Sequence, residues 1–231
     1  MLKFVDCIFS ATGANRNAKV YGLTLNGEEE ALLERCTFNG TGYAAVLNKT
    51  AGDVTIKDCD FECGNYKNPI EGDAGTAIQG NLTVEDCSFT GIPGNNFINI
   101  YQAKEGATHL IKGCDFHGGY DNNIVRLSNK NNASAVITLE DCSCEFIEGE
   151  LSEYTGVVLC QDYTNKDGIF QDFSLYEVNI NNLEWPEEGS LVYCYTDGIG
   201  IDNENHPVLY VNGETSVWMS GEDMIEEEGQ L

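Results

Sequence analysis

The octapeptide Leu82-Thr-Val-Glu-Asp-Cys-Ser-Phe89 decides the fold, because close copies of it recur along the chain. The copy before it is Val54-Thr-Ile-Lys-Asp-Cys-Asp-Phe61, and six segments in all align without gaps on one cysteine. The aligned residues are Cys7, Cys36, Cys59, Cys87, Cys114 and Cys142. Their separations of 29, 23, 28, 27 and 28 residues define a repeat of about 27 residues, which is typical of stacked-repeat proteins.

Each copy predicts two short strands with a bend between them. Leu82 and Val84 are two residues apart, and so are Cys87 and Phe89, which is the period of a strand with one buried face. The polar pair Glu85-Asp86 between them is the predicted bend. A further strand is expected later in each repeat, at 44–47, 76–78, 97–101, 124–127, 156–160 and 191–194.

Three short strands per repeat predict an all-β chain that winds as a single-stranded parallel β-helix of about seven coils, stacked about 4.8 Å apart. The seventh coil is expected at 176–180, where Val178 and Ile180 take the places of cysteine and phenylalanine. A β-sandwich is the competing all-β fold, but it needs turns every 8 to 12 residues or so, which the longer repeat contradicts. The predicted domains are a β-helix over 1–205 and a cap with an acidic tail over 206–231.

Stacked repeats place equivalent residues above one another. The six aligned cysteines are therefore expected to form one buried column. A second column is expected from Phe9, Phe38, Phe61, Phe89 and Phe116. Six of the ten cysteines occupy one repeat position and no Cys-x-x-Cys pair occurs, so mostly free thiols are predicted rather than a disulfide scaffold.

The two ends of the repeat array differ. At the C-terminal end, 208–211 and 215–218 flank Asn212-Gly213, which is a strong signal for a β-hairpin cap. Residues 222–231 form an acidic tail. At the N-terminal end the first strand begins at Phe4 with no cap before it, so either a partner chain or a larger protein is expected to cover that edge.

Charge narrows the range of partners. The formal net charge is −26, with 12 Lys and Arg against 38 Asp and Glu. Such a surface repels nucleic-acid phosphates and anionic lipids, so neither nucleic acid nor membrane is a predicted partner. The N-terminus lacks the apolar stretch of a signal peptide, so the chain is expected to be cytosolic as made, or a mature or shortened form.

No metal or cofactor is predicted. His109 and His117 flank Cys114 eight residues apart, which is not the spacing of a ligand pair, and both are expected on surface bends. The Asp-rich bends could offer oxygen ligands to Ca²⁺, but no EF-hand pattern occurs.

The repeat over about residues 4–200 resembles the right-handed parallel β-helix of the pectin lyase-like superfamily. That architecture includes pectate lyases, polygalacturonases, bacterial surface adhesins and phage tail or capsid-decorating proteins. Tyr195-Thr-Asp-Gly-Ile199 is similar to the first polygalacturonase motif, so the resemblance implies Asp197 and Asp202 as the acid pair of such an enzyme. The other polygalacturonase motifs are missing. A pectate lyase-like set could draw only on Arg126 and the nearby Asp121.

The sequence therefore predicts a non-enzymatic structural protein, most simply a virion component such as a capsid-decorating or tail-associated phage protein. The predicted partners are other protein chains in a capsid or tail assembly, bound through the N-terminal coil and the acidic tail, and a homo-oligomer is compatible with this. Two alternatives stay open. One is a carbohydrate-binding or polysaccharide-degrading β-helix, and the other is a fragment of a secreted bacterial adhesin at the cell surface.

Overall fold

The computed structural model describes residues 1–72, 75, 77–118, 123–145, 156–162, 171–185, 194–198 and 205–220. The chain is all-β with parallel sheets, as predicted. Its helical elements in these ranges are two short 3-10 turns, η1 (Cys63–Asn65) and η2 (Phe173–Leu175). Within the described ranges, therefore, no helix has the length and apolar character that a membrane crossing requires.

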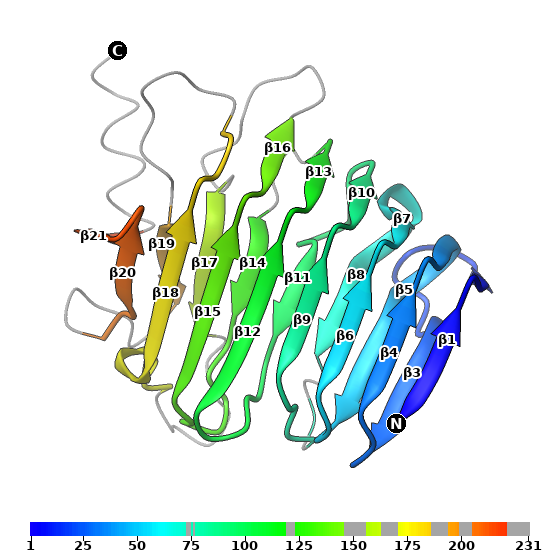
Figure 1. Ribbon diagram of the computed structural model, residues 1–231, viewed down its shortest axis with the longest axis horizontal. Helices are drawn as coiled ribbons and strands as arrows, with labels where there is room; N and C mark the ends of the chain where they lie inside the picture. The colour runs from blue at the N-terminus through cyan, green and yellow to red at the C-terminus, as the bar shows by residue number, and fades with distance from the viewer. Residues whose placement is uncertain are drawn as a thin grey trace.

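The first strand of each repeat joins a nine-stranded sheet, which we call ladder A (Figure 1). Its parallel strands are β1 (Leu2–Val5), β4 (Ala31–Glu34), β6 (Val54–Lys57), β9 (Leu82–Glu85), β12 (Ala107–Lys112), β15 (Ala135–Glu140), β18 (Tyr176–Asn181) and β20 (Val208–Val211). The ninth strand, β21 (Glu214–Ser216), pairs antiparallel with β20. Sequence order and spatial order coincide along ladder A, so each repeat lies directly against the next.

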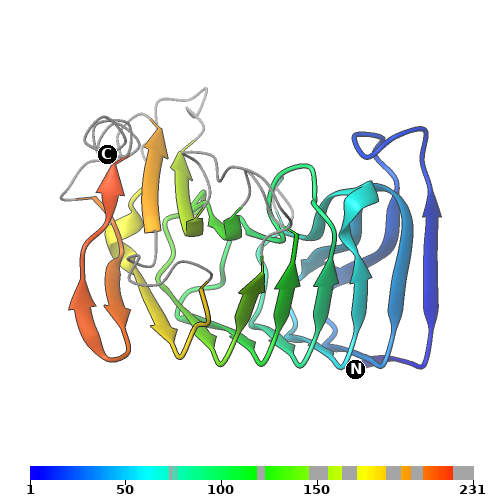
Figure 2. The same cartoon turned by 90° about the horizontal axis from the view of Figure 1, so that it is seen from above.

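The other strands form a 13-stranded sheet made of two ladders that share β5 (Thr37–Thr50). Ladder B contains β2 (Ile8–Thr12), the start of β5, β7 (Asp60–Glu62), β10 (Ser88–Thr90), β13 (Asp115–His117) and β16 (Ser143–Glu145). Ladder C contains β3 (Tyr21–Gly27), the end of β5, β8 (Tyr66–Gly72), β11 (Ile98–Ile100), β14 (Asn123–Leu127), β17 (Gly156–Asp162), β19 (Cys194–Gly198) and β22 (Met219–Ser220). Figure 2 shows the repeats following one another from the blue end to the red end.

The bend between ladders A and B is built from one residue with left-handed backbone. The φ angles are 52° at Asp58, 51° at Asp86 and 54° at Asp141, each directly before an aligned cysteine. Asp, Asn and Gly adopt this conformation more readily than other residues. Gly113 takes the position in the fifth repeat, with φ 60°, and a Cβ there would lie 2.6 Å from Asp86 Oδ1.

The two predicted core columns are confirmed. The five cysteines from Cys36 to Cys142 are buried, while Cys7 at the end of the stack is half-buried. Neighbouring rings of the phenylalanine column are stacked, with centroid distances between 4.7 and 4.9 Å from Phe9 to Phe116. The sequence period therefore gives a continuous apolar core.

The predicted alignment of the seventh copy is wrong. Val178 pairs with Ile137 and Ile180 with Leu139, so both belong to the strand before the bend. Asn182 carries the left-handed bend, with φ 55°, and Leu183 follows it at the cysteine position. The error arose because the strands on both sides of the bend have the same alternation of apolar residues.

A strand was also predicted in the wrong place in the third repeat. The strand of ladder C there is β8, whereas Ala77 lies outside any strand and Ile78 is exposed. Pro69, which cannot donate a backbone hydrogen bond, and the surrounding Asn and Gly residues disguised β8 as a loop. The strand expected at 191–194 begins at Cys194, and residues 191–193 lie outside the described part of the chain.

The C-terminal hairpin is confirmed, although its second strand is Glu214–Ser216 and not 215–218. β20 and β21 pair antiparallel across Asn212 and Gly213, whose φ angles of 51° and 79° match the two-residue turn that the pair predicts. Asn212 Oδ1 accepts a hydrogen bond from the Asn182 backbone N–H at 2.8 Å, so the turn sits above the bend of the preceding repeat. The acidic tail at 222–231 lies outside the described residues.

Candidate functional site

The residues proposed from the polygalacturonase resemblance do not form a described pair. Asp197 lies exposed in β19, where its Oδ2 accepts a hydrogen bond from Gln161 Nε2 at 3.0 Å. Asp202 and Asp121 both lie outside the described residues. Arg126 lies in β14 and is buried. The described part of the chain therefore tests neither predicted set of catalytic groups.

The two histidines lie in different environments. His117 is partly exposed, as predicted, but it is the last residue of strand β13 and not part of a bend, and its Nδ1 lies 3.1 Å from Glu145 Oε2. The prediction for His109 is wrong, because it lies in β12 and is only 2% exposed. Its position in ladder A belongs to an inward row, which sequence alternation with Ala107 and Ile111 should have indicated.

A polar row crosses ladder C where apolar residues precede and follow it. Glu71, Asn99 and Arg126 occupy the same position in three successive strands, between Leu47 and Leu159. Asn99 Nδ2 donates a hydrogen bond to Glu71 Oε2 at 2.7 Å. All three polar residues are 2–3% exposed, so this row is sealed from solvent.

Burial sets the proton affinity of Glu71. Desolvation of its carboxylate raises the pKa to about 7, and this outweighs the opposing effects of the Asn99 hydrogen bond and of the positive charges on Arg126 and Lys67. A carboxyl group with a pKa near neutrality can gain or lose a proton under physiological conditions. This property makes Glu71 the strongest candidate for proton transfer among the described residues.

Arg126 is held by an aromatic ring. Its Nη1 donates a hydrogen bond to Tyr101 Oη at 3.2 Å, and its guanidinium carbon lies 5.3 Å from the centre of the same ring. Lys130 Nζ lies 4.9 Å from that centre. The contact with the Tyr101 ring compensates part of the cost of burying the guanidinium group.

The polar row combines an acidic and a basic side chain, but it is buried, so a solute cannot reach it. A general acid must come within hydrogen-bond distance of the group it protonates, and Glu71 is 2% exposed. The row was missed from the sequence, although its members are 28 and 27 residues apart, which is the repeat period. Comparing equivalent positions between repeats could have found it.

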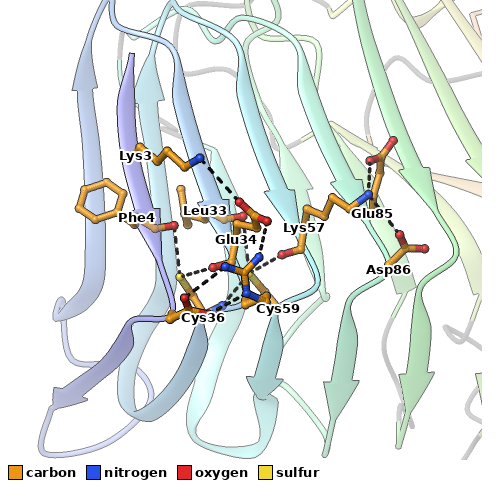
Figure 3. A network of polar contacts seen from close by, with 11 residues as sticks. Lys3, Phe4, Leu33, Glu34, Cys36, Lys57, Cys59, Glu85 and Asp86 are labelled. Carbon is orange, nitrogen blue, oxygen red and sulfur yellow. Dashed lines mark hydrogen bonds and ion pairs between the residues drawn. The ribbon is translucent and has the colours of Figure 1, made fainter.

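A second constellation lies on the surface, at the bend from ladder A to ladder B (Figure 3). Five charged residues of alternating sign share one register position there: Glu34, Lys57, Glu85, Lys112 and Glu140. Lys57 Nζ lies 3.8 Å from Glu85 Oε2 and 3.6 Å from Asp86 Oδ2. The alternation places each lysine between two carboxylates of adjacent strands. It therefore favours pairing of neighbouring repeats over pairing of repeats that are two apart, which would bring like charges together.

A polar pocket of about 460 Å³ lies where the seventh repeat departs from the pattern. Asp115, Asp141, Asn182 and Glu184 are among its lining residues. Two of the carboxylates are already engaged, since Asp115 Oδ1 accepts from Ser143 Oγ at 2.5 Å and Asp141 Oδ1 accepts from Asn182 Nδ2 at 2.9 Å. Across the described ranges, no three His, Cys, Asp or Glu side chains are grouped as a metal site would require.

The first repeat presents an apolar edge. Ile8 is 73% exposed and Leu2 is 41% exposed, while Phe4 and Phe9 are only partly covered. The strands β1, β2 and β3 each pair on one side only among the described residues. At the other end, by contrast, ladder A is closed by the hairpin of β20 and β21.

Comparison of the chain with protein-family models, with curated proteins and with solved structures gives no match.

Proposed function

We propose that the chain is a right-handed parallel β-helix of the pectin lyase-like architecture, with ladders A, B and C as its three walls. The support is that consecutive repeats contribute strands to all three ladders in sequence order. The left-handed residue before each aligned cysteine supplies the bend that such a coil needs.

On this fold the proposed function is structural: the chain is an assembly module that binds another protein chain through the edge formed by β1, β2 and β3. The observation that supports it is the apolar character of this edge. Phe4 and Phe9 continue the core of the inner repeats but are only partly covered, while Ile8, which alternates with Phe9 along β2 and lies on the outer face of this strand, is exposed. An unpaired parallel edge with uncovered apolar side chains favours the addition of further strands.

The setting we propose is a virion, where the module would decorate a capsid or a tail. A stack of identical bends and a continuous aromatic column give a rigid rod, and the net charge of −26 keeps its surface soluble. A bacterial cell-surface protein is the alternative setting for the same module.

The edge can be tested with two variants at opposite ends of the molecule. Ile8→Lys alters a residue that is 73% exposed at the proposed edge, and Val217→Lys alters one that is 75% exposed near the hairpin. Light scattering after size exclusion is expected to show self-association or association with the native assembly. Ile8→Lys is expected to weaken it at least tenfold and Val217→Lys to leave it unchanged. Equal behaviour of the two variants contradicts the proposal.

A second candidate function, polysaccharide cleavage, is favoured by one observation: Asp197, in the segment that resembles the first polygalacturonase motif, is exposed in β19. Release of reducing or unsaturated sugar from a polysaccharide panel is the direct test. Loss of such activity in Asp197→Ala would replace the structural function by an enzymatic one. No release by the wild-type chain is the result that the structural proposal predicts.

A further inference from the structure

His109 is a polar residue in an apolar row. Its neighbours at the same register position of ladder A are Leu82 and Ile137, and Val54 and Val178 continue the row on either side. Such a position normally holds an aliphatic side chain, because a buried polar group without a partner costs free energy. A specific partner for the imidazole is therefore needed.

One nitrogen of the ring is satisfied and the other is not. The backbone N–H of Leu82 donates to His109 Nδ1 at 3.2 Å, so Nδ1 acts as an acceptor and the proton of the neutral ring lies on Nε2. Burial keeps the ring neutral, since desolvation lowers the pKa of His109 to about 4. Nε2 has no hydrogen-bond partner among the described residues.

A missing side chain leaves space beside this ring. Gly72 pairs with Asn48 and takes the position that Ile100 and Leu127 fill in the next two repeats. A cavity of about 10 Å³ remains there, and both Gly72 and His109 line it. All of its lining residues are buried.

The cavity also offers acceptors. Asn48 and Gln79 line it together with His109. Asn48 Oδ1 accepts a hydrogen bond from the Thr50 backbone N–H at 3.1 Å, and Gln79 Oε1 accepts one from the Gln102 backbone N–H at 3.1 Å. An amide oxygen has two lone pairs, so each of these oxygens can accept one more hydrogen bond.

We propose that this cavity is an internal hydration site that binds one water molecule between His109 Nε2, Asn48 and Gln79. The water oxygen accepts a hydrogen bond from Nε2–H, and the water donates one hydrogen bond to each of the two amide oxygens. The volume matches the space that a single water molecule needs, and three hydrogen bonds are the usual number for a buried water. Gly72 is the residue that makes room for it.

An experimental structure at a resolution that shows ordered water, together with ¹⁵N NMR of the histidine ring, tests the site. The wild-type chain is expected to show one water in the cavity and the Nε2-protonated tautomer. In His109→Leu, which places the residue of the neighbouring strand at this position, the water is expected to disappear. An empty wild-type cavity, or an Nδ1-protonated ring, overturns the proposal.

Gly72→Ala provides a second variant that keeps the imidazole. Its Cβ would lie 3.1 Å from the Asn99 carbonyl oxygen and 3.2 Å from Gln79 Oε1, and so would compete with the water for space. The water is expected to be lost, and the chemical shift of Nε2 is expected to change. Retention of the wild-type shift in Gly72→Ala contradicts the proposed bond between Nε2 and the water.

Discussion

The residue directly before each aligned cysteine fixes where the chain bends. Asp, Asn or Gly stands there in most repeats, as its left-handed backbone requires. Arg35 is the exception, with φ 52°, and its Nε forms an ion pair with Asp6 Oδ1 of the preceding bend at 2.7 Å. Arg35 adopts this backbone conformation less readily than Asp, Asn or Gly, and at this bend an ion pair links two successive repeats.

Buried ionisable residues give the fold a pH dependence, and His109 is the sharpest case. Its pKa is about 4 in the folded chain against an ordinary 6.5, so the unfolded chain binds the proton more readily. Stability is therefore complete above pH 6.5 and is lost as the pH falls towards 4, by about 3 kcal/mol. Between pH 7 and pH 4 the free energy of unfolding, measured with urea, should fall by about 3 kcal/mol more in the wild type than in His109→Leu. Parallel profiles would contradict the burial of a neutral ring.

At the scale of strands, the repeat period predicted the elements well where the local pattern is unambiguous. The octapeptide ending in Phe89 gave two strands and the bend between them. Prediction from the repeat period failed for β8, where Pro69 hides the alternation of apolar residues. It also failed for β18, because the segments on both sides of the bend show the same alternation. Local patterns do not specify register, which depends on contacts with neighbouring strands.

The candidate site was less predictable than the fold. Asp197 was selected by likeness to a family motif, whereas Glu71, Asn99 and Arg126 are united only by stacking. All three are buried, and no local sequence pattern predicts this burial. A search for polar residues at the repeat period would have recovered the row without indicating that it is sealed.

The alternating charges at the bend predict a contribution to thermal stability that depends on salt. Lys57→Glu would place three carboxylates on adjacent strands, between Glu34 and Glu85, whereas Lys57→Gln only removes the lysine charge. The melting temperature should fall more in Lys57→Glu than in Lys57→Gln at low salt, because like charges repel. The difference should shrink at about 1 M salt, where charges are screened. A difference unaffected by salt would argue against an electrostatic cause.

Over the whole molecule, the cysteines are a packing element rather than a redox framework. All ten are free in the structure, and only Cys7 is not buried. Burial raises the pKa of Cys63 and Cys160, and that of Cys144 to about 12, so these thiols stay protonated and inert.

Thiol titration can check this arrangement. The native chain is expected to show one readily reactive thiol, which Cys7→Ser abolishes, and all ten should react once the chain is unfolded. Fewer than half reacting in denaturant would reveal disulfides, and several reacting in the native chain would show that the column is open.

The central claim is that residues one repeat apart lie directly on one another, and a double-mutant cycle tests it most directly. The rings of Phe61 and Phe89 are 28 residues apart in sequence and 4.7 Å apart in space. Phe61→Leu and Phe89→Leu, alone and combined, should give a coupling energy of about 0.5 to 1.5 kcal/mol in chemical unfolding. The control pair Phe38 and Phe116, separated by two intervening rings, should be additive within about 0.5 kcal/mol. Additivity in the first pair, or equal coupling in both, would contradict the in-register stack.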